Sequence, residues 1–298
     1  MRIPTVRVCL LAALATAACD DTVGGNVPVG GEEASDAALE RFVRRAYIDL
    51  SGLPPSDADL AAEAAALRTG GNTPAARRAL VQKLMGQASW ANVWVEELEN
   101  RVFGGDTLEV RYQFLCSIIR QQQEACRSCT AADPCDCSCQ QLSTLKTERD
   151  QLATSASDLR GGTSTSAIER RYAMAIGYFA LSGEPENRAR ALFDDFLGRP
   201  AEGEEIENAR AMIFGGLGGG PAGLLFQRHG SNYADLIDIV FDDEIYREAV
   251  VAAVFERYLA RQPSSAERSH FVSVLDANDP DAQVVIEAVL SSKEYFDP

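Results

Sequence analysis

A threefold internal repeat constrains the fold of this chain more than any other feature of its sequence. Each copy opens with an aromatic residue, has a small residue five positions later and an acid seven positions beyond that: Tyr47, Gly52 and Asp59; Phe193, Gly198 and Glu205; Phe255, Ala260 and Glu267. Each copy closes with apolar residues spaced three and four apart and a final aromatic residue, which is Trp90, Tyr246 or Tyr295. Repeats of this kind are supersecondary units that bury their apolar faces against one another.

The local signals within one copy predict a helix, a sharp turn, a second helix, a loop and a third helix. Gly52 or Gly198 can end the first helix with a positive φ, and the proline that follows prevents its continuation. Ser264 and Glu267 have the spacing of a capping box at the start of a second helix. We therefore expect an all-α fold with three related helical units, whose buried aromatic anchors are Tyr47, Trp90, Phe193, Phe196, Tyr246, Phe255, Tyr258 and Tyr295.

The repeats divide the chain into six segments. We expect a signal peptide at 1–18, a lipid-anchored flexible tether at 19–36, helical unit 1 at 37–105, a helical hairpin with a cysteine-rich tip at 106–162, a linking helix with helical unit 2 at 163–246, and helical unit 3 at 247–298. Unit 2 carries a glycine-rich insertion that the other units lack. Insertions into packed repeats usually form loops on the binding face, so Gly218, Gly219, Arg228 and His229 are candidates for contact with a partner.

The N-terminal residues have the pattern of a bacterial export signal. A basic start is followed by an apolar stretch at 8–18 that is too short to span a bilayer. Residues 14–19 are similar to a lipobox, although Thr16 occupies a position where leucine is usual, and they predict lipidation of Cys19. Plain secretion, with cleavage after Ala17, is the alternative.

The charge balance limits the classes of partner. The chain has 28 basic and 44 acidic side chains, a formal net charge of −16. Such a surface repels nucleic acid and anionic lipid headgroups. We therefore expect no nucleic-acid partner, and contact with the membrane through the lipid anchor only.

Six clustered cysteines are the most specific chemical feature of the chain. They lie between two predicted helices, at 108–123 and 140–159, and are Cys116, Cys126, Cys129, Cys135, Cys137 and Cys139. An even number of cysteines in an exported protein indicates disulfide bonds, for which six residues allow about fifteen pairings. A polar hairpin tip has little core, and covalent bonds would order it.

Two other readings of the same cysteines remain open. Cys126-x2-Cys129 and the alternating cysteines at 135–139 could provide thiolates to zinc or to an iron–sulfur cluster, or could exchange disulfides. Zinc sites usually pair two Cys-x2-Cys motifs, which this spacing does not supply. We expect no cofactor and no resident metal.

The stretch from Arg44 to Ser56, with its Tyr-Ile-Asp-Leu-Ser-Gly-Leu-Pro-Pro core, identifies a family resemblance. Residues 42–103 resemble the small helical domain of secreted, cytochrome-associated proteins of planctomycetes and myxobacteria. The C-terminal units resemble a helical module of bacterial extracellular proteins through the closing residues 289–296. The resemblance implies an envelope location and carries over no catalytic residue. It does not imply haem, because Thr130 follows Cys126-x2-Cys129 where c-type attachment needs histidine.

No catalytic constellation is evident in the sequence. Ser231, His229 and Asp235 contain the residue types of a hydrolytic triad but lack its sequence context. We therefore expect a non-enzymatic interaction or scaffold module in the cell envelope, with its body in the periplasm or at the cell surface and a protein partner. The alternative is an accessory protein that handles redox equivalents or metal through the cysteine cluster.

Overall fold

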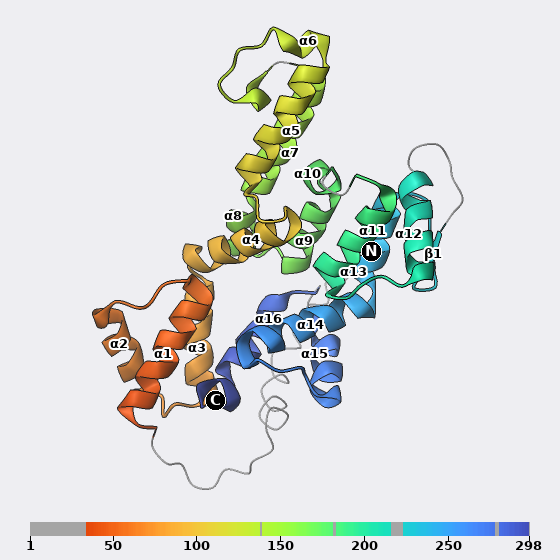
Figure 1. Cartoon of the computed structure of the whole chain (residues 1–298). Helices are drawn as coiled ribbons and strands as arrows, with labels where there is room; N and C mark the ends of the chain where they lie inside the picture. Colours follow the sequence, from red (N-terminus) through yellow and green to blue (C-terminus); the bar gives the residue numbers. More distant parts are fainter. Residues whose placement is uncertain (1–33, 138, 181–182, 216–222, 278–279, 298) are drawn as a thin grey trace, which may run out of the picture.

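The computed structural model describes residues 34–137, 139–180, 183–215, 223–277 and 280–297. Over these ranges the chain is all-α, apart from a two-stranded antiparallel ribbon formed by β1 (Gly223–Leu225) and β2 (Arg228–Gly230). The predicted fold class is therefore confirmed. Figure 1 shows a helical body from which one long hairpin projects. None of the helices in the described ranges is both long enough and apolar enough to cross a membrane.

The N-terminal half of the described chain contains the helices of unit 1, the hairpin and the linking segment. Unit 1 comprises α1 (Asp36–Ser51), α2 (Asp57–Thr69) and α3 (Pro74–Met85), followed by α4 (Ala88–Val102). The hairpin contains α5 (Leu108–Gln122), α6 (Glu124–Arg127), the 3-10 turn η1 (Pro134–Asp136) and α7 (Gln140–Ala153). The linking helices are α8 (Ser155–Arg160), α9 (Thr165–Met174) and α10 (Ile176–Phe179).

The two C-terminal units share a helix. Unit 2 comprises α11 (Pro185–Leu197), α12 (Gly203–Gly215), the ribbon and α13 (Tyr233–Asp242). Unit 3 comprises α14 (Glu244–Leu259), α15 (Ser265–Ala277), α16 (Ala282–Ser291) and α17 (Lys293–Phe296). Helix α14 both closes unit 2 through Tyr246 and opens unit 3, so the boundary expected between residues 246 and 247 lies within this helix.

The turn after the first helix is left-handed in all three units, as predicted for the two glycines. Gly52, Gly198 and Ala260 have φ of 71°, 61° and 54°, so each is left-handed although one is an alanine. Each second helix then runs for 13 residues. The aromatic anchors are all buried, as predicted. The reciprocal capping box is also present, because Glu267 N donates to Ser264 Oγ and Ser264 N donates to Glu267 Oε2.

An arginine clamp fixes this turn in units 2 and 3. Arg199 donates two hydrogen bonds to Glu205, at 2.8 and 2.6 Å, and Arg261 donates two to Glu267, at 3.0 and 2.8 Å. Each guanidinium also lies over the aromatic anchor of its unit. Unit 1 has Leu53 at the arginine position and therefore no clamp.

The units do not pack in the order of the sequence, because unit 3 lies between units 1 and 2. Helix α16 packs against α3 of unit 1, and α14 packs against α11 of unit 2. Arg45 donates to the carbonyls of Tyr258 (2.6 Å) and Tyr295 (3.1 Å), and Arg77 donates to that of Ser291 (2.7 Å). The first and last units of the described chain thus contact each other. The hairpin between them in the sequence projects from the body.

Tyrosine–carboxylate hydrogen bonds connect the insert and the units. Tyr172 donates to Glu99 (2.9 Å), Tyr246 to Glu169 (2.7 Å) and Tyr295 to Asp49 (2.7 Å). Burial, followed by the nearby carboxylate, raises the pKa of each of these tyrosines above its ordinary value. The hydroxyls therefore remain protonated donors, which keeps the buried Glu169 and the half-buried Glu99 and Asp49 hydrogen-bonded.

Candidate functional site

The end of the hairpin, residues 123–139, is the hairpin tip, and three disulfide bonds hold it. The bonds are Cys116–Cys135, Cys126–Cys139 and Cys129–Cys137, with Cα–Cα distances of 5.2, 6.0 and 5.8 Å. The predicted cysteines are therefore all paired, and their sulfur atoms are not available as metal ligands in this state. No group of histidine, cysteine or acidic residues within the described ranges has a geometry suited to a metal ion.

The connectivity explains how a segment with almost no apolar residues keeps one shape. The Cys129–Cys137 bond lies inside the loop closed by Cys126–Cys139, and Cys116–Cys135 crosses both to attach the loop to α5. The sulfur atoms of Cys116, Cys126, Cys135 and Cys137 are buried and take the place of an apolar core. Disulfides of this kind reduce the conformational freedom of the unfolded loop.

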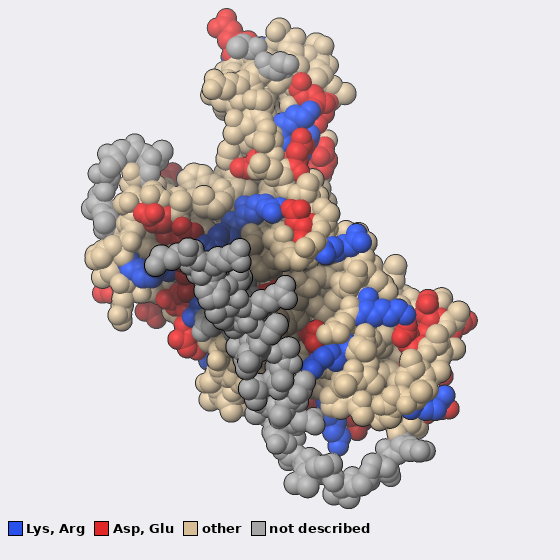
Figure 2. All heavy atoms as spheres, turned by 180° about the vertical axis from the view of Figure 1, so that it is seen from behind, with Lys and Arg blue, Asp and Glu red and all other residues tan. Residues whose placement is uncertain are grey.

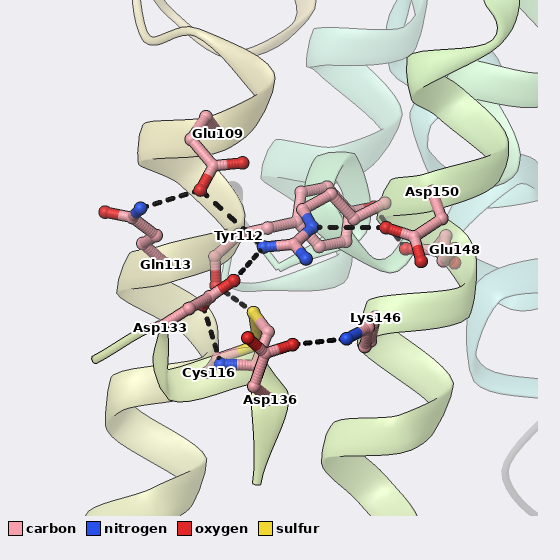
Figure 3. The surroundings of a disulfide bond; sticks show 11 residues. Glu109, Tyr112, Gln113, Cys116, Asp133, Asp136, Lys146, Glu148 and Asp150 are labelled. Carbon is pink, nitrogen blue, oxygen red and sulfur yellow. Dashed lines mark hydrogen bonds and ion pairs between the residues drawn. A yellow bond between two sulfur atoms is a disulfide. The ribbon is translucent and has the colours of Figure 1, made fainter. Parts of the chain in front are cut away.

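Ion pairs between the tip and α7 complete this arrangement (Figure 3). Arg149 donates to Asp133 at 2.7 Å, and the backbone N–H of Cys135 donates to the same carboxylate at 2.9 Å. Burial alone would raise the pKa of Asp133, but these hydrogen bonds outweigh burial and lower it. Lys146 pairs with Asp136 nearby. The tip is thus fixed to both helices of the hairpin.

A shallow, open hollow of about 530 Å³ lies beside Cys129 at the tip. Its lining residues are Arg120, Gln121, Arg127, Cys129, Thr130, Ala131 and Ala132. Arg120 donates only to the carbonyl of Ala131 (3.5 Å), and Arg127 to that of Gln121 (2.9 Å). Neither guanidinium has an ion-pair partner among the described residues, so the hollow offers positive charge in an acidic protein.

The hairpin also exposes apolar side chains on α5. Val110 is 52% exposed and Phe114 is 56% exposed. They are four residues apart and therefore lie on one face of the helix. The structure buries Leu108, Tyr112 and Cys116 of this helix, and the half-buried Leu115 and Ile119 also pack against the core.

The second candidate surface, the glycine-rich insertion, is separate from the tip. Gly218 and Gly219 lie outside the described residues. Arg228 pairs with Asp242 of α13 at 3.2 Å, and His229 is exposed opposite Leu224 on the ribbon. Figure 1 places the ribbon beside α12, away from the hairpin tip. The ribbon that carries Arg228 and His229 therefore lies apart from the hairpin tip.

Ser231 and Asp235 bond directly to each other at the start of α13, whose N-cap is Asn232. The Ser231 hydroxyl donates directly to Asp235 Oδ2 at 2.9 Å, and the Ser231 N–H donates to the same oxygen at 2.7 Å. These two hydrogen bonds lower the pKa of Asp235. In a catalytic triad the imidazole lies between hydroxyl and carboxylate, whereas here the hydroxyl reaches the carboxylate without His229.

Comparison with known proteins adds no relative. No protein-family model, no curated protein and no solved structure matches this chain. The resemblance of residues 42–103 to the cytochrome-associated helical domain therefore stays a prediction.

Proposed function

We propose that this protein is a non-catalytic, lipid-anchored module of the bacterial envelope that binds a partner protein through its hairpin. The observation that carries the proposal is the hairpin itself, which projects from the body and whose tip is fixed by three disulfide bonds (Figure 1). A rigid projecting arm loses little conformational entropy when it binds.

The surface chemistry of the arm supports protein binding. Phe114 and Val110 supply exposed apolar area, and aromatic side chains are enriched among residues that dominate protein interfaces. Arg120 and Arg127 supply guanidinium groups without ion-pair partners, which can donate to carboxylates of a partner. The hairpin therefore offers both exposed apolar area and unpaired positive charge to a partner.

The disulfides also support export. Disulfide bonds persist in oxidising compartments such as the bacterial periplasm and are rare in the cytosol. The sequence of residues 1–19 has the order of an export signal followed by a lipidated cysteine. We therefore place the body outside the cytoplasm, attached through Cys19 to one leaflet of a membrane.

Site-specific photo-crosslinking tests the arm. A photoreactive phenylalanine analogue in place of Phe114 should give one discrete crosslinked partner in intact cells. The same analogue in place of Phe214, which is 46% exposed on α12, is the matched control and should not give that product. If both positions give the same products, or if position 114 gives none, the hairpin is not the binding arm.

The redox alternative has one specific observation in its favour. Cys129 is only partly buried, and its disulfide borders the hollow that contains Arg120 and Arg127. Neighbouring cations stabilise a thiolate and so favour disulfide exchange. A Cys129–Cys137 bond that glutathione reduces while the other two bonds stay intact would support this function, and resistance of all three bonds would exclude it.

A further inference from the structure

The solvent-facing side of α1 has a composition unlike the rest of the surface. Arg41, Arg44 and Ile48 are exposed and spaced three and four residues apart, so they form one stripe along the helix. Leu53 follows immediately after the helix ends at Gly52. Ile48 is 52% exposed and Leu53 is 67% exposed, the largest value among the exposed large apolar residues of the described ranges. We refer to these four residues as the α1 stripe.

The other two repeats show that the fold does not require apolar residues at these positions. The residues equivalent to Ile48 are Asp194 and Glu256. Those equivalent to Leu53 are Arg199 and Arg261, which form the clamps described above. Unit 1 therefore lacks the stabilising ion pair of units 2 and 3. It exposes two aliphatic side chains at positions where units 2 and 3 have charged side chains.

The charge of the α1 stripe also differs from that of the protein. Neither Arg41 nor Arg44 has an ion-pair partner within the described residues, whereas the chain has a net charge of −16. The nearest acids on α1 are Glu40, which is exposed on the adjacent face, Asp36, which pairs with Arg68, and Asp49, which pairs with Arg45. The stripe is thus a small basic and apolar surface on an acidic molecule.

The position of α1 in the chain indicates what this surface contacts. The helix begins at Asp36, 17 residues after Cys19, the proposed lipid site. A flexible chain of that length has a root-mean-square span of roughly 20–25 Å, and α1 with its 16 residues is itself about 24 Å long. Anchoring at Cys19 therefore keeps the start of α1 within about one helix length of the bilayer, and a helix that lies along the membrane brings its whole exposed side there.

We propose that the α1 stripe lies on the membrane surface, where Arg41 and Arg44 bind anionic lipid headgroups and Ile48 and Leu53 enter the boundary between headgroups and acyl chains. Helices with basic and apolar side chains on one face bind membranes in this way. The proposal rests on the proposed anchor and revises the expectation that the membrane is contacted through the lipid alone. Unit 1 forms one end of the molecule in Figure 1, so this contact leaves the hairpin tip free.

Vesicle binding of the mature chain with Cys19→Ser tests the α1 stripe without any lipid anchor. Co-sedimentation at low ionic strength is compared for mixed phosphatidylglycerol–phosphatidylcholine vesicles and for pure phosphatidylcholine vesicles. We expect stronger partitioning into the mixed vesicles, and a drop of roughly 30-fold for Arg41→Gln with Arg44→Gln, at about fivefold to tenfold per arginine. The vesicle result does not depend on lipidation, because the chain that is tested has no lipid anchor. Lipidation is tested separately by the intact mass of the protein from the envelope.

Variants built from the protein's own repeats provide the apolar test and its control. Ile48→Asp with Leu53→Arg installs the residues of unit 2 and should abolish binding while the helical fold is kept. Phe214→Asp, at a position that is 46% exposed on α12, should bind like the parent chain. Equal binding to both vesicle types, or equal loss in the Phe214 variant, would overturn the proposal. Loss of a crosslinked protein in the Ile48 and Leu53 variant, with vesicle binding unchanged, would assign the stripe to a partner protein instead.

Discussion

Replacing Ala260 with glycine should stabilise this protein, although glycine normally weakens a helical protein. Ala260 ends α14 with φ of 54°, and it is exposed, so its methyl group contributes no buried area. The left-handed conformation costs a residue with a Cβ roughly 1–2 kcal/mol. Glycine removes that strain but gives the unfolded chain more freedom, which costs about 0.4–1 kcal/mol. The net expectation is about 0.5–1 kcal/mol of added stability.

Urea denaturation followed by far-ultraviolet circular dichroism measures this change as a higher midpoint with an unchanged slope. Ala253→Gly is the matched control, because Ala253 is exposed in the interior of the same helix and its replacement should cost about 1 kcal/mol. Gly198→Ala should destabilise, because Gly198 has φ of 61° with open space around it, so only the backbone conformation opposes a side chain. If Ala260→Gly destabilises the protein as much as Ala253→Gly, the repeated left-handed turn is not a source of strain.

Three further expectations concern single interactions. Cys129→Ser with Cys137→Ser opens a loop of sequence separation 8 and should destabilise the tip by about 2.5 kcal/mol. Hydrogen exchange should become faster in the tip alone. Unchanged exchange in the tip would contradict a structural role for this disulfide bond. Burial would raise the pKa of Glu267, but its hydrogen bonds from Arg261 and Ser264 lower it below the ordinary value, so its contribution is present at neutral pH and is lost as pH falls through the folded-state pKa. Glu267→Gln should therefore lower the free energy of unfolding by about 2 kcal/mol at pH 7. The urea midpoint of this variant should also fall less steeply than that of the parent as the pH is lowered. An equally steep fall would contradict the role of the Glu267 carboxylate. Tyr246→Phe removes the buried donor to Glu169 and should cost about 1–3 kcal/mol in the same urea assay, with no loss if the hydrogen bond is absent.

The local structure of the repeats was predictable because local chemistry determines it. A small residue before a proline-containing segment needs a left-handed conformation, and Gly52 and Gly198 have it. Ser264 and Glu267 lie three residues apart and form the expected capping box. The anchors are buried because apolar spacing of three and four defines one helical face. These signals act within about a dozen residues, over which residues that are close in the sequence are also close in space.

The order in which the units pack could not be predicted from the same signals. Residues far apart in the sequence decide it, such as Arg45 with Tyr258 and Arg77 with Ser291. An arginine that donates to a backbone carbonyl leaves no complementary charge pattern in the sequence. For the same reason the repeat pattern gave no indication that unit 3 would close onto unit 1.

The site was predictable in composition but not in arrangement. Six cysteines in a polar segment indicated disulfides, yet their pairing depends on how the tip folds onto α5, where Cys116 meets Cys135. The exposure of Phe114 was not predicted, because polar residues between the apolar ones leave the buried face of α5, which contains Tyr112 and Cys116, undefined in the sequence. The α1 stripe becomes visible only when Ile48 and Leu53 are compared with their charged equivalents in the other repeats.

The intact mass of the protein extracted from its native envelope without reductant tests the central claim most directly. We predict a chain that begins at Cys19, carries a lipid on that residue, and lies about 6 Da below its fully reduced mass because three disulfide bonds are formed. A mass for the chain that begins at Cys19 without lipid, or one that retains the first 18 residues, would contradict the anchor. A fully reduced mass would contradict the rigid hairpin on which the proposed binding function depends.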